Sequence, residues 1–202
     1  MTTRTRRHRR LSPLAQPSVR RSVRHSTPTW RALGRGAAAS LLLSCWALGA
    51  AALAQGAPTV VGQGVYKFWG WTIYQARLEA PAPVTPENWA QSAFTLQLEY
   101  QRSFSARDIG AQSLREMARQ GPLPEAQAQA WSQDMNRCFR DVEAGDRLSG
   151  SFDGQNQVRF AFNGQTTCSL QDAAFARRFF GIWLGPETSA PDLRDALFGQ
   201  RP

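Results

Sequence analysis

The sequence has no acidic residue before Glu79 and no histidine after His25. Its only two histidines are His8 and His25, and Lys67 is its only lysine. The rest of the chain therefore offers no imidazole for general acid–base catalysis, for Ser-His or Cys-His nucleophilic pairs, or for a histidine-ligated metal. We accordingly expect neither a metal nor another cofactor.

Positive charge is concentrated near the N-terminus. The 202-residue chain has 24 Lys+Arg against 15 Asp+Glu, a formal net charge of +9, which taken alone is typical of nucleic-acid or membrane-surface binding. Ten arginines lie in the first 35 residues: Arg4, Arg6, Arg7, Arg9, Arg10, Arg20, Arg21, Arg24, Arg31 and Arg35. Without them, 24 − 10 = 14 basic residues face 15 acidic ones, a net charge of −1. We therefore expect no nucleic-acid partner.

An apolar stretch, residues 37–54, follows the basic head and ends in Ala52-Leu53-Ala54. A positive segment, an apolar run and an A-x-A site predict a secretory signal peptide over residues 1–54, cleaved between Ala54 and Gln55. The expected product is periplasmic, has 202 − 54 = 148 residues and has no membrane span. Two alternatives stay open, an uncleaved membrane anchor and lipidation of Cys45, because residues 42–45 resemble a lipoprotein box.

Removal of the leader leaves two cysteines, Cys138 and Cys168. In an oxidising compartment these two are candidates for a disulfide. The alternative is a pair of buried free thiols that act as small apolar residues.

Strand patterns occur on both sides of a helical region. Residues 60–78 predict two strands, or one bent strand, with Gly70 at a turn or bulge. Residues 94–100 alternate, which predicts a strand with Phe94 and Tyr100 at the two ends of its buried face. Three further strands are expected over 147–152, 157–162 and 165–169, and Asn163-Gly164 predicts a type I′ hairpin turn.

Four helices are expected. Ser105 and Asp108 form a capping box before a helix that ends at Gln120, with an apolar stripe of Ile109, Leu114, Met117 and Ala118. A second helix, 125–139, buries Trp131, Met135 and Cys138, and a third covers 172–183. A last helix opens at residues 189–192, with Pro191 near its start. Helices and strands occur in separate runs, which predicts an α+β domain.

Three stretches, residues 65–78, 100–148 and 175–191, resemble the chalcone isomerase fold family, in particular its secreted bacterial branch. The resemblance implies a single domain over 55–202, an open-faced β-sandwich. Its antiparallel sheet would be covered on one face by a layer of helices, with an apolar cleft between the layers.

The family's catalytic residues do not carry over. When the motifs are anchored without gaps, the catalytic positions of the plant enzymes hold Ala57, Trp69, Gln97, Ala106, Ser113 and Asp172. A developing oxyanion needs preorganised donors, and the alanines supply no side-chain donor. The Arg/Tyr pair that holds a carboxylate in the fatty-acid-binding branch is also absent. We therefore lean against an enzyme.

Three functions stay open. The first is non-catalytic binding of a small apolar or amphipathic ligand, such as a fatty acid, by Trp69, Tyr74, Arg77, Tyr100 and Arg102. The second is an isomerase or intramolecular lyase for a conjugated or phenolic substrate, for which Tyr74, Tyr100, Arg102 and Asp172 are the catalytic candidates. The third is an envelope interaction protein with no pocket, in which the same aromatics are sheet core and the arginines lie on the surface. The oligomeric state stays open.

Overall fold

The structure is a computed structural model and describes residues 57–200. The predicted leader, its cleavage site at Ala54 and Gln55, and Cys45 lie outside the described residues.

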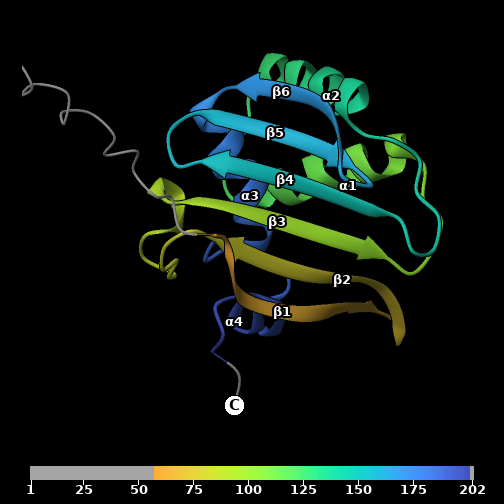
Figure 1. Cartoon of the computed structure of the whole chain (residues 1–202). Helices are drawn as coiled ribbons and strands as arrows, with labels where there is room; N and C mark the ends of the chain where they lie inside the picture. The colour runs from red at the N-terminus through yellow and green to blue at the C-terminus, as the bar shows by residue number, and fades with distance from the viewer. Residues whose placement is uncertain (1–56, 201–202) are drawn as a thin grey trace, which may run out of the picture. The chain divides into compact units, whose positions relative to one another are not determined.

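Six strands form one antiparallel sheet in which every strand pairs with its neighbours in the sequence (Figure 1). The strands are β1 (Thr59–Phe68), β2 (Trp71–Ala80), β3 (Ala93–Tyr100), β4 (Arg147–Asp153), β5 (Gln157–Phe162) and β6 (Gln165–Gln171). The region 60–78 is thus two strands joined by a hairpin turn at Trp69-Gly70, and not one bent strand. The turn predicted at Asn163-Gly164 is confirmed, since both of its residues have positive φ.

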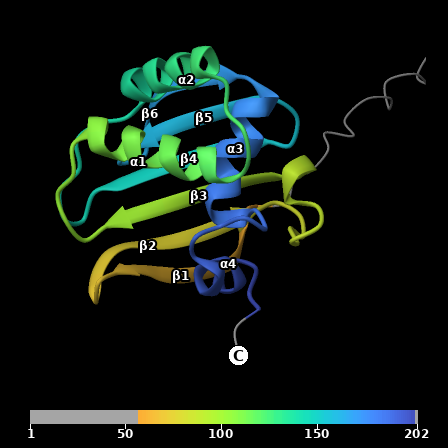
Figure 2. The same cartoon turned by 180° about the vertical axis from the view of Figure 1, so that it is seen from behind.

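The helices lie on one face of this sheet (Figure 2). They are α1 (Ala106–Arg119), α2 (Glu125–Cys138), α3 (Ala173–Leu184) and α4 (Pro191–Leu197), with a short 3₁₀ helix, η1 (Trp89–Gln91), between β2 and β3. The other face of the sheet carries mostly polar side chains, as in the contact between the hydroxyls of Thr95 and Ser151 at 2.9 Å. The predicted α+β, open-faced β-sandwich is therefore confirmed.

The core fills the space between the sheet and the helices. Strict alternation along β3 buries Phe94, Leu96, Leu98 and Tyr100 on the inner face. Helix α3 contributes a group of aromatic side chains, and Phe179 contacts both Phe160 on β5 and Phe180 in edge-to-face geometry. Such pairs add packing energy to their area burial.

Local signals set the start of two helices. The Ser105 hydroxyl accepts a hydrogen bond from the Asp108 backbone N–H at 3.1 Å, as the capping box predicts. Asp172 caps α3 by accepting from the Phe175 N–H at 2.9 Å. Helix α4 begins at Pro191, within the expected residues 189–192, and has no side-chain cap.

The buried stripe of α1 also differs from the prediction. Gly110, Ser113 and Met117 are the buried residues, whereas Ala118 is exposed. Gly110 lies against Met135 of α2, where a β-carbon would be 3.6 Å from the Met135 β-carbon. A small residue at this contact lets α1 and α2 approach closely.

Helix α4 packs equally closely on the edge strand β1. The carbonyl oxygens of Ala196 and Leu197 lie where a β-carbon on Gly62 would be. Only glycine leaves room for this backbone contact.

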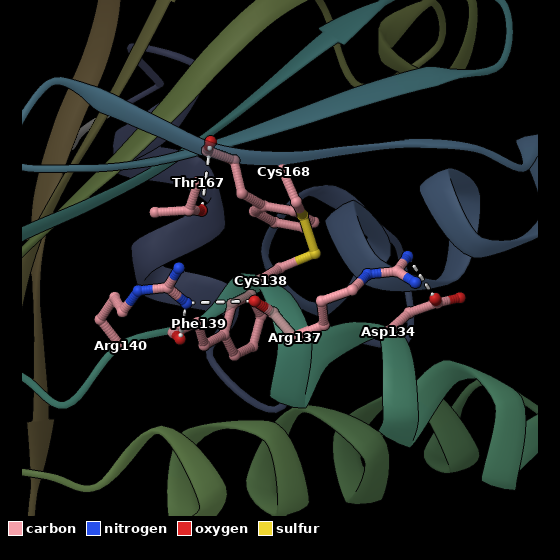
Figure 3. Close-up of a disulfide and its surroundings, with 8 residues drawn as sticks. Asp134, Arg137, Cys138, Phe139, Arg140, Thr167 and Cys168 are labelled. Carbon is pink, nitrogen blue, oxygen red and sulfur yellow. Dashed lines mark hydrogen bonds and ion pairs between the residues drawn. A yellow bond between two sulfur atoms is a disulfide. The ribbon is translucent and has the colours of Figure 1, made fainter. Parts of the chain in front are cut away.

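A disulfide joins Cys138, the last residue of α2, to Cys168 in β6 (Figure 3). The two Cα atoms are 5.2 Å apart and 30 positions apart in the sequence. The side chain of Arg140 donates to the carbonyls of Arg137 and Phe139, which satisfies backbone acceptors at the end of α2. The cross-link therefore fixes the end of α2, and with it Phe139, against the edge of the sheet.

Candidate functional site

A cavity of about 340 Å³ lies between the inner face of the sheet and the helices α1 and α3, which cross the central strands in Figure 2. Small-molecule sites typically enclose about 300–1,000 Å³. Most of its wall is aliphatic or aromatic and comes from Phe68, Ile73, Leu96, Leu98, Phe104, Ile109, Phe139, Leu148, Phe160, Phe179, Phe180, Ile182 and Trp183. This lining suits an apolar ligand.

All three tyrosines of the chain form a ladder along one wall of this cavity. The strand register pairs Tyr66 with Tyr74 and Tyr74 with Tyr100 across β1, β2 and β3. The rings of Tyr66 and Tyr74 stack at 5.1 Å, and those of Tyr74 and Tyr100 meet edge to face at 5.8 Å. The hydroxyl oxygen of Tyr74 accepts a hydrogen bond from the Trp183 indole N–H at 2.9 Å.

The three phenols stay protonated at ordinary pH. Burial raises the pKa of Tyr74 and of Tyr100 far above the usual value for tyrosine. Burial also raises the pKa of Tyr66, and the nearby Glu116 carboxylate raises it further. The tyrosines can therefore donate hydrogen bonds to a ligand, but they are poor candidates for a general base.

Polar residues gather where α1 borders the cavity. Arg115 donates to the Gln112 side-chain oxygen through Nε at 3.0 Å and Nη2 at 2.6 Å. Gln112 in turn donates to Glu116 at 3.0 Å, and Glu116 lies 3.6 Å from Arg119. Asp108 also lines the cavity. The rim thus combines one cation with two carboxylates and an amide, and it is the polar side of an otherwise apolar site.

Two of the five predicted ligand-binding residues, Tyr74 and Tyr100, line the cavity together. The other three do not. Trp69 is in the β1–β2 turn with 87% of its surface exposed. Arg77 lies on the open face, between the inward-facing Ala76 and Leu78, and forms an ion pair with Glu79 at 2.7 Å. Arg102 lies over the Trp71 ring, 4.2 Å from its centroid.

The catalytic candidates divide in the same way. Tyr74 and Tyr100 border the cavity, while Arg102 does not. Asp172 is engaged elsewhere, because it caps α3 and accepts a hydrogen bond from the Trp131 indole at 2.9 Å. Among the six positions matched to the plant enzymes, Ala57, Trp69, Gln97, Ala106, Ser113 and Asp172, only Ser113 lines the cavity. Its hydroxyl donates to the Ile109 carbonyl at 2.9 Å.

Sequence reasoning missed Tyr66 and the polar side of α1. Counting outward from the Trp69-Gly70 turn would pair Tyr66 with Ile73, and a register shift between Tyr66 and Lys67 instead brings Tyr66 opposite Tyr74. Only the aromatic character of Tyr66 could have pointed to it. The α1 residues carry no such signal, because Gln112, Arg115 and Glu116 look like an ordinary solvated helix face.

Within residues 57–200, no group of three or more His, Cys, Asp or Glu side chains is arranged to hold a metal ion. No helix in the same range has the length and apolar character needed to cross a membrane.

Comparisons with known proteins place the fold. A family model described as chalcone isomerase-like matches residues 59–199. The crystal structure of a fatty-acid binding protein from Arabidopsis thaliana is similar, with a TM-score of 0.54 and 11% sequence identity over 70% of this chain and 86% of that chain. The search of curated proteins gave no match. Because the family model covers most of the chain, this protein belongs to the chalcone isomerase-like family.

Proposed function

We propose that this protein is a non-catalytic member of its family that binds a small apolar or amphipathic ligand, such as a fatty acid, in the cavity between the sheet and the helices. The observation that carries the proposal is the cavity of about 340 Å³, whose wall is mostly aliphatic and aromatic. The likeness to a fatty-acid binding protein of the same fold supports this class of ligand.

The polarity of the cavity supports one orientation of the ligand. An acyl chain would lie against Leu96, Leu98 and Phe160, and its polar head would reach the α1 rim, near Arg115 and Gln112. Arg115 uses Nε and Nη2 to hold Gln112, and its remaining guanidinium hydrogens are suited to a carboxylate. Neutral tyrosine hydroxyls add further donors along the wall.

The same groups argue against proton-transfer chemistry. The pKa values of the tyrosines are raised, so that the phenols do not ionise near neutral pH. Lys67, the only lysine, is exposed on β1, and Arg102 and Asp172 do not line the cavity. An isomerase or intramolecular lyase stays the alternative function. It would need a base, for which the rim offers only Asp108 and Glu116.

Export to the periplasm is part of the proposal. It rests on the basic head, the apolar stretch 37–54 and the A-x-A site, and a disulfide between Cys138 and Cys168 fits an oxidising compartment. N-terminal sequencing of the protein isolated from cells would test it, with Gln55 as the expected first residue. An intact leader, or a lipid on Cys45, would replace this part of the proposal.

Ligand binding is tested by titrating the delipidated protein with dodecanoate or hexadecanoate in a calorimeter. We expect saturable binding that Leu98→Trp weakens at least about tenfold, because the larger side chain fills the cavity. Ile109→Trp fills the cavity from the opposite wall and should weaken binding to a similar extent. Gln97→Trp, on the neighbouring residue of β3, points to the open face and serves as the matched control.

The result that would overturn the proposal is equal binding by the wild type, Leu98→Trp and Ile109→Trp, with both variants folded by circular dichroism, or no saturable binding at all. The alternative is tested by adding a hydroxychalcone and following its cyclisation. A rate above that of buffer, lost in Glu116→Gln, would support the enzyme instead.

A further inference from the structure

The exposed large apolar residues of the described chain all lie on the β1–β2 hairpin, and three of them cluster at its tip. Phe68, Trp69 and Trp71 expose 57%, 87% and 62% of their surface. In both Figure 1 and Figure 2 this tip lies at the same end of the sheet as the C-terminal end of β3, which leads into Arg102 and α1. Clustered exposed aromatics on a soluble fold typically mark a contact surface.

The turn itself is built at a cost to local stability. Trp69 and Gly70 have φ angles of 51° and 81°, almost the same as the 49° and 82° of Asn163 and Gly164 in the β5–β6 turn. Asn is the residue that such a turn favours at its first position, and a bulky side chain is disfavoured there. The Trp69 ring lies beside the Phe68 ring, with 6.1 Å between the two ring centroids, and is otherwise exposed to solvent. Folding alone therefore does not account for a tryptophan at this position.

The charged residues of the tip itself, Lys67 and Arg102, are positive. Lys67 is exposed next to Phe68, and Arg102 lies 4.2 Å from the centroid of the Trp71 ring. Neither β1 nor β2 carries an acidic residue before Glu79, at the far end of the hairpin. On the cavity side of α1, Asp108 accepts from the Ser105 hydroxyl and Glu116 from Gln112, neutral partners that leave both carboxylates charged.

We propose that the hairpin tip, defined as Lys67–Trp71 together with Arg102, docks on the surface of an anionic lipid bilayer. Tryptophan is enriched at membrane interfaces because its ring has an apolar body and a polar N–H. Lys67 and Arg102 would meet the anionic headgroups while Phe68, Trp69 and Trp71 enter the interfacial layer. Charge complementarity and the aromatic tip together favour this partner over a second copy of the chain or another protein.

The position of Phe68 links the tip to the cavity. More than half of the surface of Phe68 is exposed, and Phe68 also lines the cavity. Tyr66 on β1 and Ile73 on β2 line the cavity as well. Docking would therefore bring the cavity wall next to the bilayer, a source of apolar ligands. Binding of the tip to lipid does not itself require a ligand, so that the proposal stands or fails independently of the function proposed above.

The test is hydrogen–deuterium exchange of the full chain with and without vesicles of phosphatidylglycerol and phosphatidylethanolamine. A local readout is needed because residues 37–54 are themselves apolar. We expect amide exchange in residues 64–74 to slow about tenfold with these vesicles, to slow much less with phosphatidylcholine, and to recover in about 1 M salt. Residues on β5, far from the hairpin in the sheet order, serve as the internal control.

Two variants separate the tip from general hydrophobicity. Trp69→Asn combined with Trp71→Thr should abolish the protection, whereas Val60→Thr, an exposed apolar site at the other end of β1, should leave it unchanged. The proposal is overturned if exchange at the tip does not respond to anionic vesicles. It is also overturned if protection appears without lipid and grows with protein concentration, since the tip would then join copies of the chain.

Discussion

The Trp183 indole N–H donates a hydrogen bond to the Tyr74 hydroxyl oxygen at 2.9 Å, although the two residues are 109 positions apart in the sequence. Trp183 lies near the end of α3 and Tyr74 in β2, and both line the cavity. This bond holds the helix layer to the sheet at the wall of the candidate site.

Replacing Tyr74 with phenylalanine removes the acceptor and leaves the Trp183 N–H without this bond. Because Trp183 is 7% exposed, we expect a loss of about 1–3 kcal/mol in the free energy of unfolding. Tyr100→Phe is the matched control, since the Tyr100 hydroxyl makes no hydrogen bond to another residue in the 57–200 range. Urea denaturation measures both, and equal losses in the two variants would contradict the role assigned to the bond.

Alkaline pH should destabilise the protein. The pKa values of Tyr74 and Tyr100 are raised in the folded state, while unfolded tyrosine ionises near pH ~10. Above that pH the unfolded chain binds fewer protons than the folded one, so the stability present at lower pH is lost as pH rises, by up to about 1.4 kcal/mol per pH unit for each tyrosine. Denaturation at several pH values, with phenolate absorbance recorded in parallel, checks this. Ionisation of all three tyrosines near pH ~10 in the folded protein would contradict it.

Loss of the disulfide should lower stability without removing the fold. A cross-link that closes a loop of about 30 residues is expected to stabilise by about 3.5 kcal/mol through the entropy of the unfolded chain. The double variant Cys138→Ala with Cys168→Ala should therefore unfold at a lower urea concentration than the wild type. A reductant should lower the urea midpoint of the wild type by a similar amount. A reductant that has no effect on the wild type would indicate free thiols.

Trp69→Asn should stabilise the protein, an uncommon direction for a point substitution. Asn tolerates the positive φ of this position better than Trp does, and we expect a gain of about 0.5–1 kcal/mol. Trp69→Ala provides the comparison, because alanine loses the exposed ring without gaining tolerance for positive φ. Thermal and urea unfolding rank the stabilities of the wild type, Trp69→Asn and Trp69→Ala. If Trp69→Asn is the least stable of them, the ring contributes to folding in a way that its exposure does not reveal.

Most of the secondary structure of this fold can be predicted from the sequence. The alternation from Phe94 to Tyr100, the Ser105 cap and the Asn163-Gly164 turn are local signals, and each specifies its element without help from distant residues. Hydropathy predicts the wrong stripe on α1, because its buried face consists of Gly110, Ser113 and Met117. Hydropathy gives no weight to small residues that are buried because two helices approach closely.

The candidate site was harder to predict. Tyr74 and Tyr100 were named for their aromatic character, but their contact follows from the register of β2 and β3, which depends on pairing across the sheet. The nearness of Arg77 and Arg102 to the aromatics in the sequence predicts anion partners. Alternation places Arg77 on the opposite face, and Arg102 packs on Trp71. The volume of the cavity depends on how all the side chains fill the layer, and no single segment encodes it.

The uninterrupted order of the six strands bears on how the chain folds. Each strand pairs with the strand that precedes it, so the sheet can extend strand by strand as the polypeptide emerges, although β4 joins β3 only after α1 and α2 have been made. Helices α3 and α4 both follow β6: α4 packs on β1, the first strand, and α3 supplies much of the aromatic cover of the inner face. Until residues 173–184 are available, that apolar face has no complete cover. The last stretch of the chain therefore determines when a nascent molecule stops being prone to aggregation.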